Sequence, residues 1–201
     1  MKRFVLVCTL ALSSFALMAQ APQPGKVHLK SNDVIAGVVD INSFGNSASV
    51  TTEDGRQLTY HASMISSIET TDECDFKREF RCFDYRSNSF FDRMEKKIFQ
   101  VVSDGKITLL RRVFEYDVFD TTDEYTIEEW YFINKDGKVK RIRNFKRQLY
   151  PLMSSHEEAM NAFRERNQLG NLNREENMFL MVSFYNRIHN LSDGSLSLGV
   201  Y

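Results

Sequence analysis

Basic side chains are concentrated in one short stretch of the 201-residue chain, residues Lys135–Arg147. Lysine and arginine at this density are typical of surfaces that bind polyanions through their charged groups. Phe145 and Tyr150 lie close by in the sequence and offer rings on which a base can stack. The candidate polyanion-binding residues, which share one predicted hairpin arm, are Lys138, Lys140, Arg141 and Arg143. Lys146 and Arg147 extend the same run.

The same basic run has a second interpretation, which is ion pairing within a sheet. The Asp136-Gly137 turn brings the run opposite a strand that carries Glu128 and Glu129, and oppositely charged side chains pair across neighbouring strands. The formal net charge of −1 also argues against a protein that binds nucleic acid. We therefore favour cross-strand pairing, and nucleic acid is not the expected partner.

Carboxylates gather in one acidic stretch between two predicted strands. Its members are Asp117, Asp120, Asp123, Glu124, Glu128 and Glu129. The stretch lacks the spacing and the glycine of an EF-hand loop, so it predicts a solvated turn that keeps a sheet edge soluble. A glycosidase-like pair of carboxylates stays open as an alternative, because such pairs come from residues that are remote in sequence.

The motifs of the common catalytic and cofactor sites are missing from the sequence. It has no Gly-x-Ser-x-Gly, no glycine-rich phosphate loop and no His-Glu-x-x-His. The four histidines, each in a different predicted element, are His28, His61, His156 and His189. We therefore predict no catalytic residue, no cofactor and no metal, which favours a non-catalytic protein over an enzyme.

The N-terminus has the layout of a signal peptide. Lys2 and Arg3 precede an apolar run at Phe4–Leu12, and Ser13–Ala19 supplies the small residues of a cleavage site after Ala19. The apolar run is too short to span the roughly 30 Å of a bilayer core. We expect export of a soluble chain to the periplasm or beyond, with no transmembrane segment after cleavage and a formal charge of about −3.

Two cysteines follow the predicted leader, Cys74 and Cys82, while Cys8 lies inside it. Disulfides persist in the compartments that exported proteins reach. The spacing of eight residues is compatible with a bridge across a small loop or hairpin. We predict a structural disulfide between Cys74 and Cys82, and two free thiols are the alternative.

The segment that follows the leader alternates in the manner of short strands separated by tight turns. The predicted strands are Lys26–Lys30, Val34–Ile41, Ala48–Thr52, Arg56–Tyr60 and Ile65–Ile68, with a turn of 3₁₀ helix at 61–64. The phrase at Gly25–Val39 resembles the opening of SH3-like or Sm-like modules. The resemblance implies a small SH3-like β-barrel at residues 20–72, and it implies no activity.

The rest of the chain reads first as a meander and then as helices. The predicted strands are Ile98–Ser103, Lys106–Val118, Tyr125–Asn134 and Lys138–Arg143, and Asp104-Gly105 and Asp136-Gly137 are the turns of two hairpins. Ser155 with Glu158 predicts a capping box, and Gly170 predicts the end of that helix. A second helix carries an apolar stripe through Met178–Ile188. We predict an α+β unit at residues 73–191, an antiparallel β-meander packed by C-terminal helices, and a flexible tail at 192–201.

This second half resembles a group of exported proteins of unknown function from Bacteroidetes-type bacteria. The resemblance lies in a basic strand that leads into Phe145–Leu152, and in the Phe184-Tyr185-Asn186 sequence near the end of the last helix. It implies export and supplies no catalytic residues.

We therefore expect an interaction module that binds another envelope protein or a cell-surface polymer through exposed aromatic side chains. The aromatic residues considered are Phe76, Phe80, Phe83, Tyr85, Phe90 and Phe91. Alternation puts Phe76 and Phe80 on one side, where we expect both to be buried, and plain core packing is the alternative for the whole group. The partner-binding candidates are Phe83, Tyr85, Phe90 and Phe91. The alternative function is a hydrolase that acts on an envelope or dietary polymer through a carboxylate pair.

Overall fold

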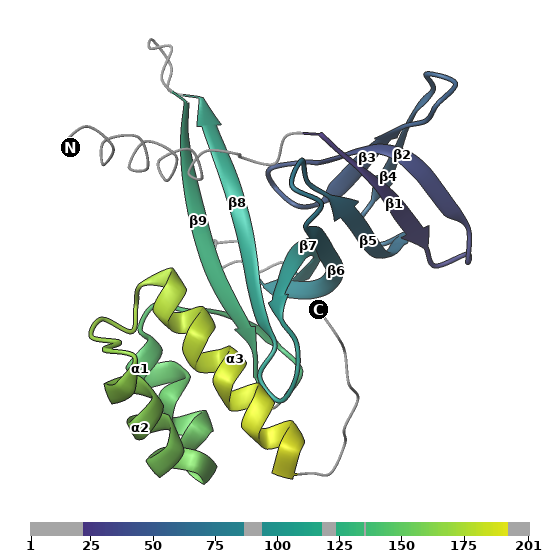
Figure 1. The fold of residues 1–201 in the computed structure, drawn as a ribbon. Helices are drawn as coiled ribbons and strands as arrows, with labels where there is room; N and C mark the ends of the chain where they lie inside the picture. The colour runs from purple at the N-terminus through teal and green to yellow at the C-terminus, as the bar shows by residue number, and fades with distance from the viewer. Residues whose placement is uncertain (1–21, 87–93, 118–123, 135, 193–201) are drawn as a thin grey trace, which may run out of the picture.

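The computed structural model describes residues 22–86, 94–117, 124–134 and 136–192. Alternating apolar and polar residues produce the strands, and helical periodicity produces the C-terminal helices (Figure 1). The strands are β1 (Gln23–Leu29), β2 (Val34–Ile41), β3 (Ser47–Thr51), β4 (Gln57–His61), β5 (Ile65–Thr71), β6 (Lys77–Arg86), β7 (Met94–Ser103), β8 (Leu109–Asp117), β9 (Glu124–Ile133) and β10 (Val139–Arg141). The helices are α1 (Phe145–Gln148), the 3₁₀ helix η1 (Tyr150–His156), α2 (Glu157–Arg166) and α3 (Glu175–Ser192).

The strands of the described residues form one open antiparallel sheet in the order β10-β9-β8-β7-β6-β5-β1-β2-β3-β4. Asp104-Gly105 and Asp136-Gly137 lie in the connections between β7 and β8 and between β9 and β10, as predicted, but each connection is longer than the expected two-residue turn, since the two run over residues 104–108 and 134–138. The α+β class and the meander are therefore confirmed. A closed small barrel at residues 20–72 is not confirmed, because β4 lies at one edge of the sheet and pairs with β3 alone among the described strands.

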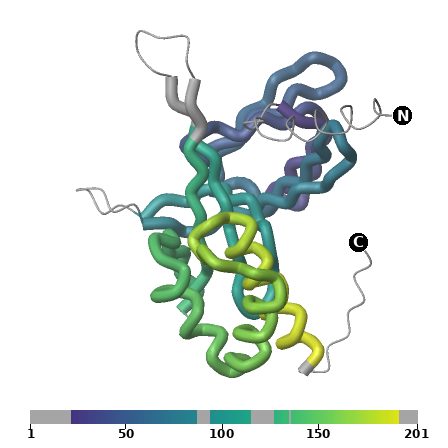
Figure 2. Tube along the Cα trace, turned by 60° about the vertical axis from the view of Figure 1, so that its left-hand side comes forward, coloured from purple at the N-terminus to yellow at the C-terminus, as the bar shows by residue number. Residues whose placement is uncertain are grey.

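The first five strands bury their own apolar side chains, and the next two strands complete that core. Val27, Val50 and Ile65 are fully buried in it. Phe80 of β6 and Ile98 of β7 belong to the same cluster. In Figure 2 this N-terminal part of the trace curves back on itself. The core of β1–β5, the N-terminal half of the sheet, therefore extends into β6 and β7, which begin its C-terminal half.

The helices cover one face of the second half of the sheet, over the lower parts of β8 and β9 in Figure 1. Leu109, Trp130 and Phe132 supply the sheet side of this core. The helix side includes Phe145, Leu149, Met153, Met160, Met178, Met181, Val182 and Tyr185. The apolar stripe predicted for the last helix is thus confirmed by the buried residues of α3.

The opposite face of the same strands carries a smaller apolar cluster, formed by Phe99, Leu110, Tyr131 and Val139. The sheet curls around this cluster, so that the short strand β10 comes into contact with β6 although three strands separate them in the sheet. This curl makes a concave surface on the side that the helices leave uncovered.

One strand is missing from the sequence prediction, and two local expectations are wrong. The strand β6 (Lys77–Arg86) was not predicted, because most of its residues are half-buried on both faces and no clear alternation marks it. The Ser155/Glu158 capping box is not formed, since α2 begins at Glu157 and the hydroxyl of Ser155 lies 3.4 Å from that of Tyr185. The chain leaves α2 through Gln168, whose φ is 54°, and not through Gly170.

The predicted disulfide is a further correction, because Cys74 and Cys82 are both free thiols. Cys74 is exposed in the turn before β6, where the Asp72 carboxylate accepts a hydrogen bond of 3.0 Å from its backbone N–H. Cys82 lies in the middle of β6, and the strand from Lys77 to Cys82 spans about 16 Å, well beyond the reach of a disulfide. Burial raises the pKa of the Cys82 thiol to about 11, so this thiol is not a reactive one.

Candidate functional site

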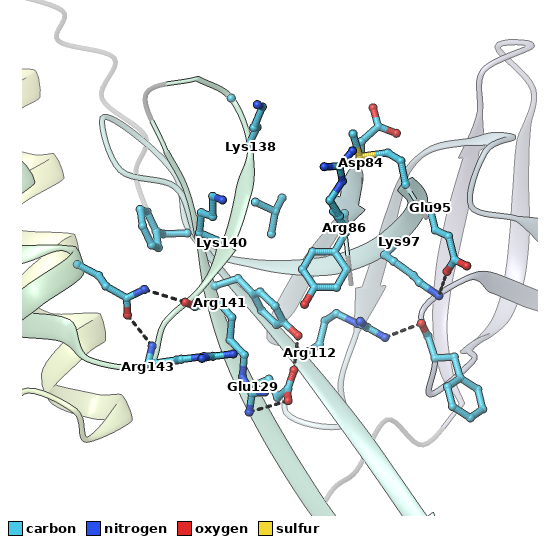
Figure 3. Close-up of a pocket in the computed structure, with 18 of the residues that line it drawn as sticks. Asp84, Arg86, Glu95, Lys97, Arg112, Glu129, Lys138, Lys140, Arg141 and Arg143 are labelled. Atoms are coloured by element: carbon cyan, nitrogen blue, oxygen red, sulfur yellow. Dashed lines mark hydrogen bonds and ion pairs between the residues drawn. The ribbon is translucent and has the colours of Figure 1, made fainter. Parts of the chain in front are cut away.

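A cleft of about 1130 Å³ opens on the concave face of the sheet, between β10 on one side and β6 and β7 on the other (Figure 3). Seven of the described residues that line it are basic and three are acidic. The basic residues are Arg86, Lys97, Arg112, Lys138, Lys140, Arg141 and Arg143, and the acidic ones are Asp84, Glu95 and Glu129. The cleft is therefore an electropositive site built where the sheet curls.

The four predicted polyanion-binding residues all line this cleft. Lys138, Lys140, Arg141 and Arg143 come from β10 and its flanking turns. Lys146 and Arg147, from the same basic run, belong to α1 and are not among the lining residues described. Gln148 orients this wall, since its side chain accepts 2.6 Å from the Arg143 N–H and donates 3.1 Å to the Arg141 carbonyl. The fold thus divides the basic run into a cleft part and an outer part.

The side of the cleft nearest the N-terminal strands contains a buried guanidinium, that of Arg112, which is only 6% exposed. Its Nη2 donates 2.5 Å to the Phe44 carbonyl, which belongs to the loop between β2 and β3. The ring of Phe114 lies 4.4 Å from the guanidinium carbon. Burial lowers the pKa of Arg112 from its usual value, and the nearby Tyr131 and Glu129 oppose that shift. An arginine remains protonated under these conditions, so the cleft holds a fixed positive charge at low dielectric.

The carboxylate of Glu129 lies between the basic groups. It forms an ion pair of 2.7 Å with Nη2 of Arg141 and accepts a hydrogen bond from the Tyr131 hydroxyl (Figure 3). Burial raises the pKa of Tyr131, and the bond to Glu129 raises it further, so this phenol stays a hydrogen-bond donor. The predicted cross-strand pairing of the basic arm is therefore confirmed at Glu129. At Glu128 it is wrong, because that side chain faces the other side of the sheet and pairs with Arg111 at 3.2 Å.

The opposite wall of the cleft comes from β6 and β7, with Arg86 and Lys97 as its cations (Figure 3). Lys97 pairs with Glu95 at 2.8 Å, and Asp84 pairs with Lys96 at 3.0 Å. Each of the three carboxylates in the cleft is thus held by a cation rather than by a second carboxylate. This arrangement differs from a glycosidase site, in which two carboxyl groups flank the glycosidic bond that is cleaved.

The predicted partner-binding aromatics separate in the structure. Tyr85 lines the cleft, and its ring packs edge-on against Tyr131 at 5.4 Å between centroids. Phe83 packs against Phe99 at 6.1 Å and is not among the lining residues described. Phe90 and Phe91 lie outside the described residues.

The expectation that Phe76 and Phe80 are buried together is wrong. Phe80 is 3% exposed, whereas Phe76 is 65% exposed. Phe76 belongs to the turn before β6, and only Phe80 lies within the strand where alternation operates.

A pair of neighbouring carboxylates lies on the helix-covered face of the sheet, away from the cleft. Glu175, in the first turn of α3, has its pKa raised by burial and by the neighbouring Glu128 carboxylate. Arg111 stands beside this pair, with its guanidinium 5.9 Å from the centre of the Trp130 ring. The pair is remote in sequence and was not predicted, and none of its members lines the cleft.

Two histidines from different helices lie close together in the structure. The rings of His156 and His189 lie 6.0 Å apart, and Tyr185 lies 5.9 and 5.8 Å from them. Within the described ranges no group of three or more His, Cys, Asp or Glu side chains is arranged to hold a metal ion. Asp120 and Asp123 of the acidic stretch lie outside those ranges.

Comparison of the chain with protein-family models, with curated proteins and with solved structures gives no match. Across the residues that the structure describes, none of the helices has the length and apolar character needed to cross a membrane. The chemistry of the cleft is therefore the basis on which a function can be argued.

Proposed function

We propose that this protein is a non-catalytic binding module that takes an anionic cell-surface polymer into the cleft between β10 and β6–β7. The observation that carries the proposal is the excess of basic side chains around one concave surface, seven against three acidic ones among the described lining residues. Such a surface attracts anions over a distance and holds them by charge-assisted hydrogen bonds.

The size and openness of the cleft favour a polymer over a small metabolite. Small-molecule pockets usually measure about 300–1,000 Å³ and enclose most of their ligand. This cleft is larger, at about 1130 Å³, and Phe44 and Met94 on its lining are 64% and 56% exposed. Several units of a chain-like ligand fit into a site of this size, with the rest of the polymer passing out at its ends.

The hydrolase alternative has less support. It requires two carboxyl groups that face a shared substrate site, and Glu128 and Glu175 lie on the helix-covered face of the sheet and do not line the cleft. Among the described residues we therefore assign no catalytic role.

We further propose that the chain is exported and that its first five strands are an SH3-like module. The leader-like residues 1–19 support export. The pairing order β5-β1-β2-β3-β4, together with a core formed mainly by these five strands, supports the module. Export would bring the cleft into contact with envelope polymers.

The test is a titration of the purified protein with polygalacturonate, dextran sulfate, polyphosphate and single-stranded DNA at several salt concentrations. We expect at least one non-nucleic polymer to bind, with an affinity that falls steeply as salt rises. The double variant Lys138→Ala/Lys140→Ala is expected to weaken binding and to lower the salt slope by about two. DNA as the preferred ligand, or no binding by any of the four, would overturn the proposal.

The matched control is Lys146→Ala/Arg147→Ala. It removes two charges from the same basic run, but from α1 and outside the residues that line the cleft. Equal losses in the two double variants would mean that net charge alone governs binding and that the cleft is not the site.

A further inference from the structure

We infer that Glu129 fills the anion position of the cleft in the free protein, and that a carboxylate of the bound polymer displaces it. The ligand would then be a carboxylate-bearing polysaccharide, one built from uronic acid units. This inference rests on the proposed function and names the class of ligand that the same site would bind.

The groups around Glu129 form a complete carboxylate site. Arg141 reaches one carboxylate oxygen at 2.7 Å, and the Tyr131 hydroxyl donates to the other. Arg112 adds an attractive positive charge. The Arg141 guanidinium and the Tyr131 phenol therefore contact the anion directly, while the Arg112 guanidinium, which donates to the Phe44 carbonyl, acts on it through its charge. Guanidinium and phenol groups are donors with which proteins recognise carboxylates. In the free protein they are occupied by a side chain of the protein itself.

The exposed fractions of the side chains indicate which groups of this site are held in place and which can move. The Arg112 side chain is held by the Phe44 carbonyl and by aromatic rings, and it is 6% exposed. The Glu129 side chain is 17% exposed, and that of Arg141 is 47% exposed. A carboxylate that arrives from solvent therefore meets Arg141 first, while Arg112 stays in place behind it.

The composition of the lining favours a sugar polymer as the carrier of the carboxylate. Tyr85, Phe114 and Phe44 present rings beside the charged groups, and the apolar faces of sugar rings pack on aromatic rings. A site already shaped around the planar carboxylate of Glu129 suits a uronate better than a tetrahedral sulfate or phosphate.

The test compares Glu129→Gln with wild type in the binding of polygalacturonate, dextran sulfate and polyglutamate. Glu129→Gln removes the internal competitor and leaves Arg112 and Arg141 available, so the affinity for polygalacturonate is expected to rise about threefold to tenfold. The rise is expected to be smaller for dextran sulfate and for polyglutamate.

The matched control is Glu128→Gln, which removes the same charge from the neighbouring residue of β9 on the other face of the sheet. An equal rise in affinity in the control would mean that the change in net charge alone explains the effect. A loss of affinity in Glu129→Gln would make Glu129 a residue that positions Arg141, and stronger binding of polyglutamate would identify a peptide carboxylate. Each of these results overturns the inference, while binding of any of the non-nucleic polymers by wild type would leave the proposed function intact.

A second measurement does not depend on how the variant folds. In wild-type protein labelled with ¹³C glutamate, the carboxyl resonance of Glu129 is expected to move when polygalacturonate is added, because its cation partners change. The resonance of Glu128 is expected to stay in place. A Glu129 resonance that stays fixed at saturation would contradict displacement.

Discussion

At the residue scale, Glu175 and Glu128 are two neighbouring carboxylates beside Arg111, and Glu175 lies at the protein surface. Burial first, and then repulsion by Glu128, raises the pKa of Glu175 above its ordinary value of 4.5. A carboxyl group whose pKa is higher in the folded chain binds its proton more tightly there than in the unfolded chain. Its contribution to stability is therefore complete below pH 4.5 and is lost as the pH rises through the folded pKa.

The direction of this pH dependence can be tested with Glu175→Gln. In wild type, Glu175 lowers the free energy of unfolding as the pH rises from about 4.5 toward 7. The glutamine variant has no such group, so its stability is expected to fall less over the same interval. Urea unfolding at several pH values measures this slope. Glu176→Gln, an exposed neighbour in the same helical turn, is the control and should keep the wild-type slope. Parallel curves for wild type and Glu175→Gln would contradict the assignment.

The sequence predicts the role of some residues of the cleft and not of others. The basic arm was recognisable because its charges are dense, and Lys138, Lys140, Arg141 and Arg143 do line one cleft. Arg112 was missed, because next to Arg111 it reads as one more exposed charge on a strand. The two arginines point to opposite faces, and only the curl of the sheet and the Phe44 carbonyl explain why one of them is buried.

At the scale of elements, Asn186 of α3 fastens the helix to the turn between β7 and β8. Its side-chain oxygen accepts 2.9 Å from the Ile107 N–H, and its nitrogen donates 2.8 Å to the Ile107 carbonyl. The same nitrogen lies 3.1 Å from the Ser103 hydroxyl. Because Asn186 is only 4% exposed, water does not readily replace these bonds.

We therefore predict that Asn186→Ala destabilises the protein by about 2–4 kcal/mol, since it leaves two backbone groups of Ile107 without partners. Chemical denaturation followed by the fluorescence of the single tryptophan measures the loss. Asn190→Ala removes an exposed amide one helical turn further on, and it is expected to change stability by less than about 0.5 kcal/mol. Similar values for the two variants would show that the contacts of Asn186 contribute little.

Elements with strong local signals were predictable, and elements defined by packing were not. The Asp104-Gly105 and Asp136-Gly137 turns correctly joined their strands. The strand β6 went unrecognised because it lies mid-sheet, between the two halves, with half-buried residues on both faces. Its pairing with β7 joins the two halves of the sheet, and no alternation of apolar and polar residues in the sequence indicates that pairing.

At the scale of the whole molecule, the loop between β2 and β3 connects the N-terminal strands to the cleft. The Gly45 carbonyl accepts 2.7 Å from the Ile98 N–H of β7, and the Phe44 carbonyl accepts from Arg112 of β8. Gly45 has a φ of 64°, and a Cβ at this position would lie 3.0 Å from the Ile98 carbonyl and 3.1 Å from the guanidinium. The close approach of the two halves thus depends on a glycine and on one buried arginine.

We predict that Arg112→Met weakens this connection and lowers the free energy of unfolding by about 2–4 kcal/mol, because the Phe44 carbonyl loses its charged donor. Methionine keeps much of the side-chain volume, so the loss reports on the charge and its hydrogen bonds. Hydrogen exchange is expected to show faster exchange at Ile98 and across residues 42–46, whereas the amides of α3 change only with global stability. Arg147→Met, at an exposed position on α1, should leave both measurements unchanged. If Arg112→Met matched that control, the link between the N-terminal strands and the cleft would have to come from the shared core of Phe80 and Ile98 instead.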